Sequence, residues 1–352
     1  MTFDYLRYNS YVGSTDPVSK KGIFNTTTSL LIGDALWTWT SAFTFETASA
    51  GAWQEQSLAT LNNHYSNPPF DVGSSSGNFN VVKGAQLLKI PKAKTYRIKC
   101  QGAGGGSDYV GNGGGKGYTY QADFALSKGQ IIRIVVGGKG GRFNYTAGGG
   151  GASHVGIVSS FTSDGTMATN DLLIMAGGGG GGGNSGGNGF DAAIGNNGVS
   201  GNASGTYNRP GSNGMGGGRS AGGGGWGQGG AGFLGRSYGS NGGHGNWEGS
   251  DYGYAQNGSD SGYYRGANQS HGTAYTSDIF FSPQASCYGA AGGFGGGGSG
   301  QCNGGGGGAG YSGGGAGGGG GGSYVSSSAL TSTGLGNVGT SDLDGYVQIT
   351  PL

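Results

Sequence analysis

The residues that most resemble catalytic motifs lie in glycine-rich stretches and match those motifs only in part. Lys116 follows three glycines, as in a phosphate-binding loop, but Val110 stands where that loop has its first glycine and Gly117 where it has Ser or Thr. The stretch ending at Lys139 departs in the same way. The hydrolase pattern G-x-S-x-G occurs at Ser185 and elsewhere, but glycine and serine are so frequent here that chance explains it. These motifs predict no enzyme activity.

Residues that could hold a metal ion or form disulfides are sparse. Four histidines occur, His64, His154, His244 and His271, without the spacing of metal ligands. Asp342 and Asp344 resemble half of a calcium loop, but the distal Glu is missing, so a turn is the simpler interpretation. Cys287 and Cys302 could be bridged, or all three cysteines could be reduced thiols. We therefore expect no metal ion and no cofactor, and we leave the cysteine pairing open.

A stronger functional signal is the aromatic segment 228–293. Tyr and Trp supply rigid, amphipathic contact area, which favours a recognition surface. The alternative is that these rings, Phe233 among them, pack on the glycine runs and fill a thin core. Residues 184–210 form a second, less aromatic candidate loop. The predicted receptor-binding residues are Tyr238, Trp247, Tyr252, Tyr254, Tyr263, Tyr264, Arg265 and Tyr275.

Glycine dominates the composition, with 92 of 352 residues, whereas about 7 per cent is ordinary. Charged residues make up only 10 per cent and the formal net charge is +1, so we expect no nucleic-acid partner and no binding to an acidic membrane surface. The apolar stretches are shorter than the ~20 residues that cross a membrane, and residues 1–10 lack the features of a signal peptide. We therefore expect synthesis in the cytoplasm and no membrane insertion.

The distribution of glycine predicts two domains. Residues 1–80 contain six glycines and residues 81–352 contain the other 86, with a polar stretch near 71–80 at the boundary. The first domain is predicted to be a small α+β unit, with a strand in Leu30–Phe45 and a short helix within Ala52–Tyr65. Because so short a domain buries little core, we expect it to dock on the second domain or on a partner.

Short runs of strand composition alternate with glycine runs in the second domain. In one of them, apolar Tyr96 and Ile98 alternate with basic Arg97, as in a strand with one buried face. Lys128 and Gly129 lie between two such runs and predict a turn. The predicted strands are Lys94–Gln101, Tyr118–Phe124, Gln130–Val136, Ser153–Val158, Leu172–Ala176 and Gly345–Pro351. This pattern predicts a mainly β fold, an antiparallel β-sandwich.

The glycine runs can be either flexible linkers or packed structure. A run in the extended threefold conformation has no internal hydrogen bonds, and its N–H and C=O groups point outward. Such runs can bond one another side by side, because no Cβ keeps the backbones apart. The run Gly177–Gly183 follows a predicted strand directly, and the region is rich in aromatics, which favours packing. We therefore predict an inserted bundle of polyglycine II helices, which Gly180→Val would disrupt.

Several segments together resemble known glycine-rich domains. They read YRIKCQGAGGG, then GGGKGYTYQADFALSKGQIIRIVVGGKGG, then DLLIMAGGGGGGG and a closing DGYVQIT. This order is similar to glycine-rich regions of bacteriophage tail-fibre proteins and to the glycine-rich extracellular region of the anaplastic lymphoma kinase family. The resemblance covers roughly residues 94–352. It implies a jelly-roll-like β-sandwich that carries polyglycine helices.

The phage resemblance fits the sequence better than the kinase one, because the chain has no membrane span and no kinase domain. T-even-type tail-tip adhesins combine a short attachment unit with a glycine-rich domain whose loops contact the host. We therefore expect a virion protein, a tail-fibre or tail-tip adhesin, which binds a protein or glycan receptor and docks to other virion proteins through residues 1–80. The alternatives are a purely structural virion protein and a secreted matrix or ligand protein. The chain could form a homo-oligomer.

Overall fold

The structure is a computed structural model. It describes residues 39–47, 57–70, 77–82, 84–161, 167, 169–202, 209–218, 227–234, 289–290, 292–301, 303–338 and 340–352. The chain divides into two compact units, Met1–Trp39 and Thr40–Leu352, and all elements below belong to the second. This unit begins before the boundary expected near residues 71–80. The role of the N-terminal domain in docking stays a prediction.

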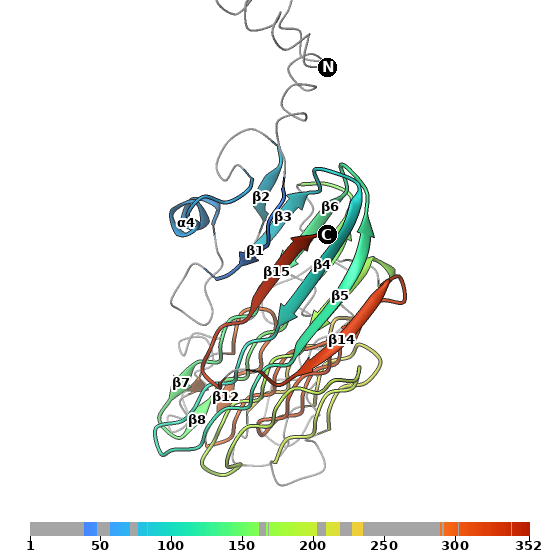
Figure 1. The fold of residues 1–352 in the computed structure, drawn as a ribbon. Helices are drawn as coiled ribbons and strands as arrows, with labels where there is room; N and C mark the ends of the chain where they lie inside the picture. The colour runs from blue at the N-terminus through green and yellow to red at the C-terminus, as the bar shows by residue number, and fades with distance from the viewer. Residues whose placement is uncertain are drawn as a thin grey trace, which may run out of the picture. The chain divides into compact units, whose positions relative to one another are not determined.

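Two antiparallel sheets form the second unit (Figure 1). The first has the strand order β1 (Phe43–Phe45), β15 (Tyr346–Pro351), β4 (Lys94–Gln101), β5 (Thr119–Leu126) and β14 (Thr331–Gly336). The second has the order β13 (Tyr324–Val325), β10 (Leu172–Ala176), β9 (Ser153–Val158), β6 (Ile131–Val135), β3 (Ala85–Lys89) and β2 (Phe79–Val82). Strands β4, β5 and β15 contact β9 and β10 across the space between the sheets. The mainly β, sandwich-like prediction is confirmed, whereas the jelly-roll strand order stays a prediction.

The remaining elements are short. Two two-stranded ribbons occur, β7 (Arg142–Phe143) with β8 (Thr146–Ala147) and β11 (Gly289–Ala290) with β12 (Gly300–Gln301). A 3-10 turn, η1 (Thr169–Asp171), precedes β10. The helix α4 (Leu58–His64) begins after Ser57, whose hydroxyl accepts a hydrogen bond from the Thr60 N–H at 3.1 Å. This is an ordinary N-cap, and it lies inside the range predicted for the helix.

The first sheet buries one face, as the alternation in β4 predicts. Tyr96, Ile98 and Cys100 are fully buried, whereas Arg97 on the other face forms an ion pair with Asp123 at 2.8 Å. All six predicted strands are present, three of them with the predicted bounds. The predicted turn is also present, and its Gly129 has φ +82°, a conformation that favours glycine.

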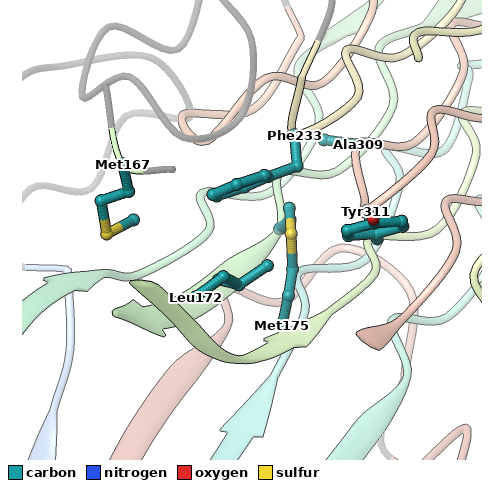
Figure 2. Packing of buried hydrophobic residues seen from close by; sticks show 7 residues of the cluster. Met167, Leu172, Met175, Phe233, Ala309 and Tyr311 are labelled. Atoms are coloured by element: carbon teal, nitrogen blue, oxygen red, sulfur yellow. The ribbon is translucent and has the colours of Figure 1, made fainter. Parts of the chain in front are cut away.

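The middle strands of the second sheet, β3, β6, β9 and β10, are mostly buried on both faces. Every residue of β10 is buried, so a second layer must cover the face that does not meet the first sheet. Figure 2 shows that layer: Phe233 and Tyr311 lie over Leu172 and Met175 of β10. The two rings are stacked, with centroids 6.3 Å apart. Phe233 and Tyr311 belong to the glycine-rich region and lie far from β10 in the sequence. Their contacts with β10 connect that region to the sandwich.

The glycine runs lie beside one another and exchange backbone hydrogen bonds. In the run 177–183, Gly178 and Gly181 both donate to residues 306–309, while the two residues after each of them donate to other segments. The donors therefore return to the same neighbour every three residues. Similar three-residue steps occur at residues 102–106, 147–152, 306–311 and 313–317. An extended threefold helix presents its N–H groups with this period.

Candidate functional site

The eight residues predicted to contact a receptor, from Tyr238 to Tyr275, all lie outside the described residues. Their role stays a prediction. Phe233, from the same aromatic segment, is described and is fully buried. Its ring packs on Tyr311 and meets the His154 ring edge-on, with centroids 6.1 Å apart. At this residue the packing alternative is correct.

A different set of exposed residues gathers where three loops meet. We call this surface the loop end; it consists of residues 107–112, 142–146 and 340–344. Its large exposed side chains are Tyr109 (62% exposed), Tyr145 (52%), Val110 (50%) and Leu343 (50%). Two of the four are tyrosines, which suit recognition surfaces because they offer contact area with few rotatable bonds.

The first loop is organised by a buried carboxylate. Asp108 is 1% exposed, and one of its oxygens accepts the backbone N–H groups of Val110 and Asn112 at 3.0 and 2.8 Å. The other oxygen accepts the Asn112 side-chain amide at 2.7 Å. Such carboxylate–backbone bonds mimic a backbone turn. They hold Tyr109, which lies between the bonded residues, in one place.

The second loop is joined to the first. The Tyr109 N–H donates to the Asn144 carbonyl at 2.8 Å, and the Arg142 guanidinium lies 4.1 Å from the centre of the Tyr109 ring. A cation over an aromatic face is attractive, so this contact helps to orient the exposed ring. The carbonyl of Tyr145 accepts the N–H of Asn184 at 3.0 Å. Both tyrosines are therefore held through their backbones.

The third loop carries the two aspartates that resemble half of a calcium loop. Asp342 accepts the N–H of Ser107 at 2.9 Å and also its hydroxyl. Asp344 accepts the N–H of Lys139 at 2.7 Å and the hydroxyl of Thr47 at 3.1 Å. Both carboxylates are thus hydrogen-bonded to other segments of the chain. Residues 341–342 form a turn, as the turn interpretation predicts for Asp342. Among the described residues, no group of three or more His, Cys, Asp or Glu could hold a metal ion.

The loops are rooted in glycine segments that leave no space for side chains. A Cβ added at Gly106 would lie 2.3 Å from the carbonyl oxygen of Gly141, and one at Gly114 would lie 2.0 Å from that of Gly105. Real Cβ atoms essentially never come within 3.0 Å of another group. The backbones that carry the loops are therefore packed at distances that glycine alone permits. This is a stiff support for the exposed tyrosines.

Two buried groups with shifted pKa values lie away from the loop end. Burial, with a smaller contribution from the charge of Arg133, holds the pKa of His154 well below its usual range. Neither ring nitrogen of His154 has a hydrogen-bond partner among the residues that the structure describes, and the side chain is fully buried. Burial also raises the pKa of the Cys100 thiol. A neutral His and a protonated thiol without solvent access are suited to packing and unsuited to catalysis.

The signal for the loop end was present in the sequence but dispersed. Asp108 and Asn112 flank a Tyr-Val-Gly turn, and Asp and Asn are the residues that bond to their own backbone in turns. The second loop has a similar Asn144-Tyr145 pair, with Asn144 at φ 38°. Sequence reasoning gave more weight to the density of aromatic residues in 228–293. It therefore missed this surface, which is assembled from loops far apart in the chain.

No protein family matches the chain, and no curated protein is significantly similar to it. The described residues define a fold class, an antiparallel β-sandwich with a glycine-rich layer. In the described part of the chain, no helix has the length and apolar character needed to cross a bilayer.

Proposed function

We propose that this chain is a bacteriophage tail-fibre or tail-tip adhesin that binds a receptor on the host surface and catalyses no reaction. The observation that carries the proposal is the loop end, where Tyr109 and Tyr145 are more than half exposed on loops held by hydrogen bonds. Exposed aromatic anchors on a preorganised support lose little conformational entropy on binding. A rigid support therefore favours binding, because the loops need not be ordered when the receptor binds.

We further propose that the glycine runs are polyglycine II helices and form this support. The three-residue step of the hydrogen bonds is the argument for it. Each run forms backbone hydrogen bonds with several neighbouring runs, so a force on one loop is distributed over all of them. In this proposal the virion is the location, and the segment 235–288 adds a second contact surface through the eight predicted residues.

Binding of the purified full chain to whole bacterial cells tests the function. Tyr109→Ser/Tyr145→Ser removes both exposed rings of the loop end, and deletion of 235–288 removes the other predicted surface. Leu352→Ser is the control, because Leu352 is 50% exposed and follows β15 at the end opposite Asp344. If the loop end binds the receptor, the dissociation constant of the double variant for the cells rises about tenfold or more, as on loss of a central anchor. The dissociation constant of the control does not change.

The outcomes separate the alternatives. Loss of binding only on deletion of 235–288 would move the receptor site to that segment and remove the loop end from the proposal. If neither the natural protein nor any variant binds saturably, and the protein is incorporated into phage particles, the chain is a structural virion protein and the adhesin proposal is wrong.

A further inference from the structure

The first sheet ends in a strand whose outer edge is unpaired among the described residues. Among the described residues, β14 pairs with β5 on one side and has no neighbour on the other. Thr331 to Leu335 are all exposed. The N–H and C=O groups along such an edge can pair with a strand from another chain. β14 is also the longest edge strand described, since β1, β2 and β13 have three, four and two residues.

The features that usually prevent edge pairing are almost absent from β14. Natural edge strands are protected by charged side chains, proline, short length or a bulge. From Ser323 to Ser341 the chain has no charged residue and no proline, and β14 is six residues long. The one protective feature is an irregular register between Gly334 and Gly336. It leaves Thr331 to Gly334 in regular register with β5.

Exposed apolar side chains lie in β14 and close to it. Leu330 is 60% exposed, Leu335 40% and Val338 52%. Ile194, which is 60% exposed, reaches the strand, because a Cβ at Gly334 would lie 3.0 Å from its Cδ1. A partner strand paired with β14 would cover part of this surface. Apolar burial would then add to the backbone hydrogen bonds.

We propose that β14 pairs antiparallel with β14 of a second copy of this chain. The two five-stranded sheets then form one continuous sheet across a twofold axis, with the same patch used on both copies. An identical partner is favoured because an uncharged strand opposite itself meets no like charge, and threonines paired across strands are favourable. The net charge of +1 adds little long-range repulsion between copies. A strongly charged partner would find no complementary charge here.

The apolar residues are needed because a single pair of short strands buries a small area. Specific, stable interfaces bury roughly 1,200 Å² or more in total. In the dimer, Ile194, Leu330, Leu335 and Val338 of both copies contribute area around the axis. The proposal does not depend on the adhesin function, since it concerns the association of the chain with itself.

The oligomeric state of the full chain tests this pairing. Sedimentation or light scattering is measured for the natural protein, for Thr333→Lys/Leu335→Lys, and for Asn62→Lys/Asn63→Lys. The control adds the same charge at exposed positions of α4. Lysines near the axis face those of the other copy, so the dissociation constant of the β14 variant is expected to rise about tenfold or more. Circular dichroism and melting temperature establish that all three proteins are folded.

Hydrogen exchange gives a second readout that is specific to the edge. In the dimer, amides of β14 that point away from β5 exchange slowly, and they exchange fast in the β14 variant. A natural protein that stays monomeric at its highest soluble concentration overturns the proposal. A dimer that is unaffected by the two β14 lysines also overturns it, as does a monomer whose β14 amides are protected by another part of the chain.

Discussion

Gly180 lies in the middle of the glycine run 177–183, where the packing can be tested with a single methyl group. A Cβ at this position would lie 1.8 Å from the carbonyl oxygen of Gly318 and 2.2 Å from its carbon. To restore a separation of 3.0 Å, the two runs must move apart by 3.0 − 1.8 = 1.2 Å. The same carbonyl accepts the Phe190 N–H at 2.7 Å, and the Gly180 N–H donates to the Phe190 carbonyl at 2.9 Å. Both bonds would lengthen.

The expected destabilisation follows from these two effects. Overpacking a close-packed interior costs about 1–3 kcal/mol, and a buried polar group that loses its partner costs about 1–3 kcal/mol. Gly180→Ala should therefore lower the free energy of unfolding by roughly 3 kcal/mol or more. Gly180→Val adds two further methyl groups and should cost more.

Gly195→Ala is the matched control, because a Cβ there meets no atom within 4 Å and its φ is not left-handed. Its unfolding free energy should stay within about 0.5 kcal/mol of the natural protein or rise slightly, since alanine restricts the unfolded chain. Urea unfolding followed by circular dichroism measures both variants. Equal stabilities for Gly180→Ala and Gly195→Ala would refute the argument that glycine is required by backbone contact.

Three further predictions concern titratable groups. In the unfolded chain His154 is protonated near its ordinary pKa of about 6.5, whereas burial keeps it neutral in the fold. As pH falls below about 6.5, the free energy of unfolding of the natural protein should decrease by up to about 1.4 kcal/mol per pH unit. Urea titrations at each pH should show a smaller decrease for His154→Gln. The hydrogen bond from Arg97 is the main cause that lowers the pKa of Asp123, followed by a hydrogen bond from Thr331 and the charge of Arg97. Arg97→Gln should therefore raise that pKa in a carboxyl NMR titration, and an unchanged value would contradict the assigned cause. Burial raises the pKa of Cys100, so mass spectrometry should find its thiol unmodified by iodoacetamide in the folded protein and modified in urea, and rapid native labelling would contradict its full burial.

Much of the sandwich was predictable because strand periodicity records burial locally. The alternation of Tyr96, Arg97 and Ile98 fixes which face of β4 is inside, and the continuous apolar run of β10 marks a strand that is buried on both faces. β14 was not foreseen, because Thr, Ser and Gly give no burial period in a strand that is exposed on both faces. It is a strand because β5 offers it a row of backbone hydrogen-bonding groups.

The sequence by itself determined the composition of the glycine layer, the six principal strands and the turn at Gly129. Each is a local property, set by side-chain period or by the absence of a side chain. The tertiary structure alone decided which glycine run lies beside which, as in the bonds from Gly178 to residues 306–309. It also decided that residues 107–112, 142–146 and 340–344 meet at one surface. Glycine runs of identical sequence cannot specify which other run they lie beside. Their pairing is therefore decided by the strands that position the ends of each run and by the closure of long loops.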